Sequence, residues 1–187
     1  MTFPFLTMVS WSPSLVLLAV GAATDLKDRW IPDEISIALA VIGLAQRLVV
    51  SPGSVWLSLA ATSLVFCGLA IASHYRIIGG GDLKLVSAVT LLVPPAQVGS
   101  LLLDIAFAGG ALACLYLSAR LGLRMLAPQE ASRADRRAGG CAAAMATERE
   151  RIAAGGPLPY GVAIFGGVGV YAAGELALCF SALFSSS

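Results

Sequence analysis

Two aspartates at the ends of long apolar segments are the side chains of this chain best placed to do chemistry. Asp25 lies just before Pro32, and Asp82 follows three glycines at 79–81. Two neighbouring carboxylates share a proton, because they do not both ionise easily. The charged one can take a proton from water while the neutral one hydrogen-bonds a peptide carbonyl. The pair therefore predicts cleavage of an amide bond without a covalent intermediate.

Composition places these acids in a membrane protein. Of the 187 residues, 58% are hydrophobic and 12% are charged, against roughly 25% charged in a soluble domain. Mean hydropathy is +0.86, so the lipid bilayer is the main solvent. A net charge of +1 excludes nucleic-acid binding driven by overall field. The four scattered cysteines form no CxxC pair, so we expect no metal site and no cofactor.

Six apolar segments predict an all-α, polytopic protein with about six transmembrane helices. They lack the alternation of strands, and most suit a hydrocarbon core of about 30 Å. The fourth is short because two prolines stop it. We find no internal repeat and treat 1–187 as a single membrane-embedded domain. The segments are residues 4–23, 35–50, 55–73, 83–94, 98–119 and 160–184.

Basic residues predict the orientation of these helices. Lys27, Arg76, Lys84 and an Arg-rich loop at 121–156 fall on one side, and the opposite loops offer only Arg47. By the positive-inside rule, both aspartates and the Arg-rich loop face the cytoplasm, and both termini face outward. The loop reads either as a solvated anchor or as a docking surface for a partner or anionic lipid.

Helix ends suggest a role for each acid. Asp82 opens a helix, where partial positive charge favours an anion, so it is the expected base; Asp25 closes a helix and is the expected acid. Gly79, Gly80 and Gly81 are expected to give backbone freedom and close substrate approach. A plain turn with Asp82 as helix cap is the alternative.

These motifs resemble those of prepilin peptidases, membrane proteases of the GxGD aspartic class. The stretch from Asp25 to Asp33 is similar to the family's first motif, an Asp followed by a hydrophobic-Pro-Asn/Asp step. Residues 79–85 resemble its GxGDxK motif, and 159–164 resemble the proline–aromatic–glycine opening of a late helix. The likeness is greatest to the short form associated with tight-adherence (Flp-type) pili.

The resemblance implies an aspartic endopeptidase of the bacterial inner membrane that removes the basic leader from type IV prepilins. Asp25 and Asp82 would be its catalytic pair. Pilin-like proteins would be its substrates, with pilus assembly machinery as a further candidate partner. Without the CxxC-bearing domain of the long forms, no N-methylation is expected.

Several other residues are assigned supporting roles at the predicted cleft. Pro32 belongs to the first motif. Lys84 is expected to reach the interface, the leader or lipid, since it cannot share the helix face of Asp82. The late-helix residues are either helix punctuation or lining of the cleft where an extended substrate binds; they are Pro159, Tyr160 and Gly161.

Intramembrane acids away from the pair need their own explanation, because they are costly in lipid. Asp104 and Glu175 are predicted to form a polar cluster with Arg47 near the outer face; a proton or ion pathway and plain exposure are the alternatives. His74 is interpreted as a residue whose amphipathic ring lies at the membrane interface.

Two functions of other classes compete with proteolysis. A small cation transporter would use Asp25 and Asp82 as ligands, but such sites lie near the midplane of repeated halves. A non-catalytic assembly factor would have no need of two acids in register. Absence of a GxSG nucleophile disfavours a rhomboid-type protease.

Overall fold

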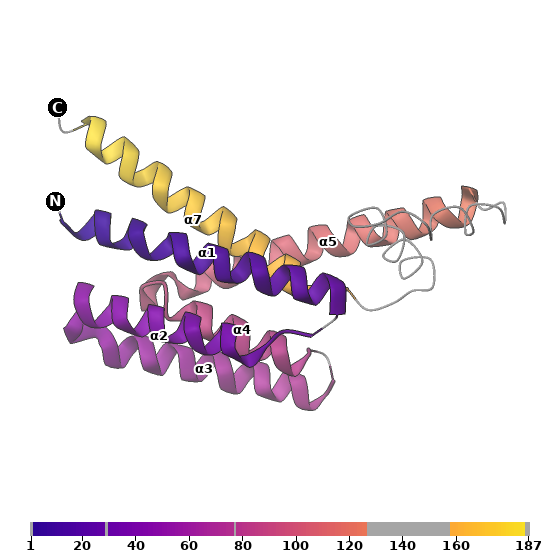
Figure 1. Cartoon of the computed structure of the whole chain (residues 1–187), viewed down its shortest axis with the longest axis horizontal. Coiled ribbons are helices and arrows are strands. Elements are labelled where there is room, and N and C mark those ends of the chain that lie inside the picture. The colour runs from indigo at the N-terminus through magenta and orange to yellow at the C-terminus, as the bar shows by residue number, and fades with distance from the viewer. Residues whose placement is uncertain (1, 29, 77, 127–157, 186–187) are drawn as a thin grey trace.

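The computed structural model describes residues 2–28, 30–76, 78–126 and 158–185, and these residues form helices and connecting segments, with no strand among them (Figure 1). The predicted all-α fold is confirmed. Most of the Arg-rich loop at 121–156 lies outside the described residues, although its first six residues continue a helix. The helices are α1 (Thr2–Asp28), α2 (Asp33–Val50), α3 (Val55–His74), α4 (Gly80–Thr90), α5 (Val98–Leu126) and α7 (Tyr160–Ser185).

Three stretches of the described chain are long and apolar enough to cross a membrane: Pro52–His74, Pro95–Gly122 and Tyr160–Leu178. The structure therefore contains six α-helices among the described residues, as predicted. Only three stretches meet the length and composition needed to cross a membrane. α4 has 11 residues, which extend about 17 Å at 1.5 Å per residue. It cannot cross about 30 Å of hydrocarbon alone.

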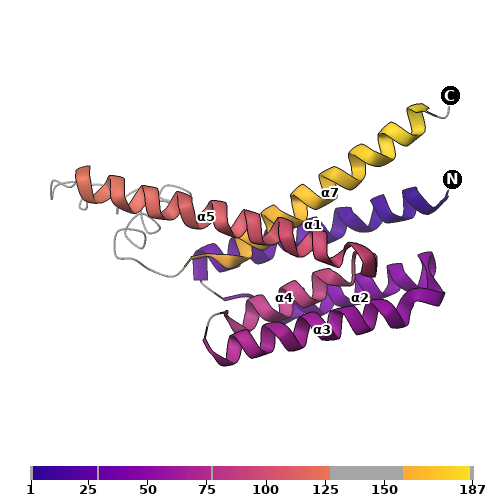
Figure 2. The same ribbon diagram turned by 180° about the vertical axis from the view of Figure 1, so that it is seen from behind.

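α4 is the most buried helix of the bundle. It packs against α2 and α3, while α7 packs against α1 and α5, and α1 joins the two groups through α2 (Figure 1 and Figure 2). After its first turn nearly every α4 residue is buried, as expected for a helix that is apolar on all sides. Its buried hydroxyls are hydrogen-bonded: Ser87 Oγ donates to the Leu83 carbonyl at 2.8 Å, and the hydroxyls of Thr90 and Thr62 on α3 lie 2.8 Å apart.

The outer faces of the long helices carry large apolar side chains. Leu64 on α3 is 75% exposed and Phe107 on α5 is 74% exposed. Soluble monomers rarely expose so many large apolar side chains, whereas the acyl chains of lipids can solvate them. Burial and exposure thus agree that this is a membrane protein.

Helix ends gather at the two ends of the bundle. The start of α1 and the end of α7 lie at one end, and the end of α1, the start of α4 and the start of α7 lie toward the other (Figure 1). This second end carries both aspartates.

Candidate active site

Asp25 occupies the last turn of α1 and is buried, with 7% of its surface exposed. Its Oδ2 accepts a hydrogen bond of 2.7 Å from the main-chain N–H of Gly161, in the first turn of α7. N–H groups at a helix start have no partner within the helix, and the helix dipole adds positive charge there. The packing of α1 on α7 therefore stabilises negative charge on Asp25.

Gly161 is required by the closeness of this contact. A Cβ at position 161 would lie 2.9 Å from the Cβ of Asp25 and 3.0 Å from its Oδ2. Any larger residue would push the two helices apart. Just before it, Pro159 is buried and Tyr160 is 44% exposed at the start of α7. The late-helix motif thus places its glycine directly on the first aspartate.

Asp82 lies in the first turn of α4 and is partly buried. Burial, reinforced by the charge of Asp25, raises the pKa of Asp82 to about 6, and a backbone hydrogen bond from Gly79 opposes this rise. The two carboxylates are therefore within electrostatic reach of each other. Although α2 and α3 separate them in the chain, α1 ends and α4 begins at the same end of the bundle (Figure 1).

The surroundings of the two acids differ from what their helix ends alone predict. Asp82 does open a helix, but burial beside a second acid outweighs that effect and favours its protonated form. Asp25 does close a helix, but its side chain reaches the start of α7, which favours its ionised form. The arrangement supports Asp25 as base and Asp82 as acid.

The three glycines before Asp82 do not adopt backbone conformations reserved for glycine, and only Gly79 and Gly81 lie close to a neighbouring side chain. Gly79 has φ −69° and ψ 148°, which any residue adopts, and neither Gly80 nor Gly81 has a left-handed φ. A Cβ on Gly79 would lie 2.9 Å from Asp82 Oδ2, one on Gly81 would lie 3.5 Å from Ile31, and one on Gly80 would meet nothing. The expectation of unusual backbone conformations is wrong here.

Lys84 joins the second motif to the first. Its Nζ lies 2.7 Å from Oδ2 of Asp33, at the start of α2, a partner that the sequence prediction does not include. Pro32 occupies the position before α2, and Ile31 is buried against Gly81. Because both charged side chains are about half exposed, the pair contributes at most about 1 kcal/mol to stability.

Comparison with known sequences decides the family. Residues 14–118, more than half of the chain, match the type IV leader peptidase family. The chain belongs to that family. The search of curated proteins and the search of solved structures each gave no match. The matched region contains Asp25, Asp82 and Lys84 and ends before Gly161.

At the other end of the bundle, Arg47 and Glu175 of the predicted polar cluster line one cavity, but they do not bond each other. Arg47 is 3% exposed and donates from Nε and Nη2 to the carbonyls of Leu91 and Leu92, at 3.2 and 2.7 Å. Glu175 accepts instead from Gln97 Nε2 at 3.2 Å. Among the described residues, no ion pair joins Arg47 to Glu175 or Asp104. The prediction found the polar residues but not their partners.

Two smaller predictions concern His74 and the cysteines of the leader peptidase. The His74 ring is exposed and stands edge-on to Tyr75 at 5.6 Å, as an interfacial residue would. Cys67 and Cys114 are free and exposed. Within the described residues no group of three or more His, Cys, Asp or Glu side chains could hold a metal ion.

Proposed function

We propose that this leader peptidase is an aspartic endopeptidase in which Asp25 and Asp82 act as one acid–base pair on the peptide bond that follows a prepilin leader. The observation that supports it is the opposite environment of the two acids. One is held by the N–H of Gly161, and the other has its pKa raised to about 6 by burial and by its neighbour. Pairs with environments that push their protonation apart are typical of acid–base catalysis.

The proposed reaction begins with a water between the two carboxylates. Asp25 takes a proton from this water while the oxygen of the water bonds to the scissile carbonyl carbon. At the same time Asp82 gives its proton to the carbonyl oxygen. The tetrahedral species then collapses: Asp25 passes its proton to the leaving nitrogen, and Asp82 regains one from the diol. The carbon–nitrogen bond breaks, and both acids return to their starting states without a covalent intermediate.

The proposal also assigns the side and the substrate. By the positive-inside rule, the basic residues near the pair support a position at the cytoplasmic face of the inner membrane, the side on which the basic leader of a prepilin would be cleaved. The motifs favour substrates of the Flp type. The reaction is confined to leader removal, with no methyl transfer.

Processing of a co-expressed Flp-type prepilin, followed on a gel, tests this proposal. Asp25→Asn and Asp82→Asn keep the shape of each side chain and should each abolish leader removal while the protein stays in the membrane. Asp28→Asn is the matched control, since Asp28 is an exposed acid three residues after Asp25 on α1 and should leave processing unchanged. Normal processing by either active-site variant would contradict the proposal.

A further inference from the structure

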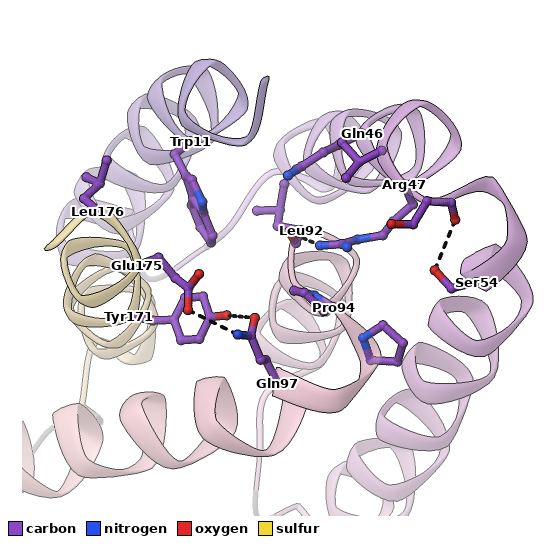
Figure 3. A pocket seen from close by; sticks show the side chains of 13 residues that line it. Trp11, Gln46, Arg47, Ser54, Leu92, Pro94, Gln97, Tyr171, Glu175 and Leu176 are labelled. Atoms are coloured by element: carbon purple, nitrogen blue, oxygen red, sulfur yellow. Dashed lines mark hydrogen bonds between the residues drawn. The ribbon is translucent and has the colours of Figure 1, made fainter. Parts of the chain in front are cut away.

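A second polar site lies at the end of the bundle away from the aspartates. It is a cavity of about 190 Å³ where the link after α4 meets α1, α2 and α7 (Figure 3). Glu175 lies 15 residues beyond the start of α7, about 22 Å along the helix. The cavity is therefore separate from the acid pair.

The cavity presents opposite charges from opposite walls. Arg47 points into it from α2 and Glu175 from α7, with the Tyr171 ring beside Glu175 (Figure 3). Tyr171 O–H donates to Gln97 Oε1 at 2.6 Å, and Gln97 in turn donates to Glu175. This chain of hydrogen bonds fixes the carboxylate on its wall.

Neither charge is neutralised by the groups it bonds. Arg47 donates to two main-chain carbonyls and Glu175 accepts from an amide, all of them neutral. A guanidinium stays charged in proteins, and uncompensated charge in a low-dielectric region is costly. A ligand that carries an anion toward Arg47 and a cation toward Glu175 would compensate both.

Location and size narrow the class of ligand. The cavity borders Ser51 and Ser54 of the α2–α3 link, a polar turn at the end of two apolar helices, and Trp11 and Tyr171 line it as aromatic residues do at a membrane interface. Its volume is below the roughly 300 Å³ of the smallest drug-sized pockets. It suits a compact headgroup rather than a peptide or a whole lipid.

We propose that this cavity binds a phospholipid headgroup with a phosphate and a primary ammonium, the chemistry of phosphatidylethanolamine. The phosphate accepts from the Arg47 guanidinium, and the ammonium donates to the Glu175 carboxylate. A purely anionic headgroup would be repelled by the Glu175 carboxylate. A headgroup with a quaternary ammonium has no N–H to donate to that carboxylate. The acyl chains would leave through the open side into the bilayer.

Thermal unfolding of the purified full chain in detergent, with added lipid, tests this site. Phosphatidylethanolamine should raise the melting temperature more than phosphatidylglycerol or phosphatidylcholine with the same acyl chains, because a ligand of the folded state stabilises it. Glu175→Gln keeps a hydrogen-bonding side chain but removes the charge, and should weaken phosphatidylethanolamine binding about tenfold. Glu34→Gln, an exposed acid at the first turn of α2, is the matched control and should bind as the unchanged protein does.

Each remaining outcome overturns the proposal. Equal stabilisation by the three lipids would show that the headgroup is not read. An unchanged preference in Glu175→Gln would remove the carboxylate from the site. Stabilisation by soluble phosphoethanolamine but not by the lipid would assign the cavity to a free solute. Glu175→Gln leaves in place the Arg47 bonds to the link after α4, and its melting temperature without lipid shows whether it is folded.

Discussion

Replacing Gly161 by alanine should separate the first aspartate from the helix that holds it. The new Cβ would lie 2.9 Å from Asp25 Cβ, whereas carbon atoms in contact prefer about 3.5–4.0 Å. The helices would have to part by about 0.6–1.1 Å. The 2.7 Å bond from the Gly161 N–H to Asp25 would then open to roughly 3.3–3.8 Å, at or beyond the limit of a hydrogen bond.

The cost of this shift falls on catalysis more than on folding. A hydrogen bond to a charged group contributes about 1.5–3 kcal/mol, and a displacement of about 1 Å at an active site costs on the order of a hundredfold in rate. We therefore expect Gly161→Ala to lower kcat/KM about a hundredfold, with the loss mainly in kcat because the leader contacts remain.

The assay is cleavage of a purified prepilin by the detergent-solubilised variants over a range of substrate concentrations. Gly166→Ala is the matched control on the same helix, since its Cβ would make an ordinary 3.8 Å contact with Ala108 and should leave cleavage unchanged. Melting temperatures of both variants show whether each is folded. A folded Gly161→Ala protein that cleaves as fast as Gly166→Ala would refute the reasoning.

Three further predictions follow from the same structure. Removing the half-exposed ion pair by Lys84→Met or Asp33→Asn should lower the free energy of unfolding by less than about 1 kcal/mol; a larger loss in thermal unfolding would show that the pair is more than a surface contact. Arg47→Met leaves two buried carbonyls after α4 without their donor and should cost at least about 2 kcal/mol by the same measurement; a neutral effect would contradict it. Because the pKa of Asp82 rises from 3.8 to about 6 on folding, the folded state binds more protons in that window, so the melting temperature should fall as pH rises from about 4 to 6. Asp82→Asn should abolish that fall, and an unchanged pH profile would disprove the raised pKa.

Local patterns in the sequence predict the elements of this fold well. Apolar length predicts the helices, and the double proline at 94–95 predicts that α4 is short. Two motifs at helix ends predict that Asp25 and Asp82 share one end of the bundle. These features depend on residues near one another in the chain, so they can be predicted from the sequence alone.

Contacts between distant helices are what the sequence does not predict. The role proposed for Asp25 depends on α7, which begins 135 residues later, and the end of its own helix does not reveal that contact. Arg47 likewise bonds carbonyls 44 and 45 residues away, which no charge pattern reveals. The sequence showed Gly161 only as part of a proline–aromatic–glycine motif. It did not show that this glycine lies in close contact with Asp25.

The central claim is that the two acids act together on one peptide bond. The most direct measurement is the rate of single-turnover cleavage by Asp25→Asn, Asp82→Asn and the double variant. Groups that act as one unit give losses that do not add. The account predicts that each single change slows bond cleavage about a thousandfold or more and that the double change is scarcely slower. Losses that multiply in the double variant, or substantial cleavage by either single variant, would contradict it.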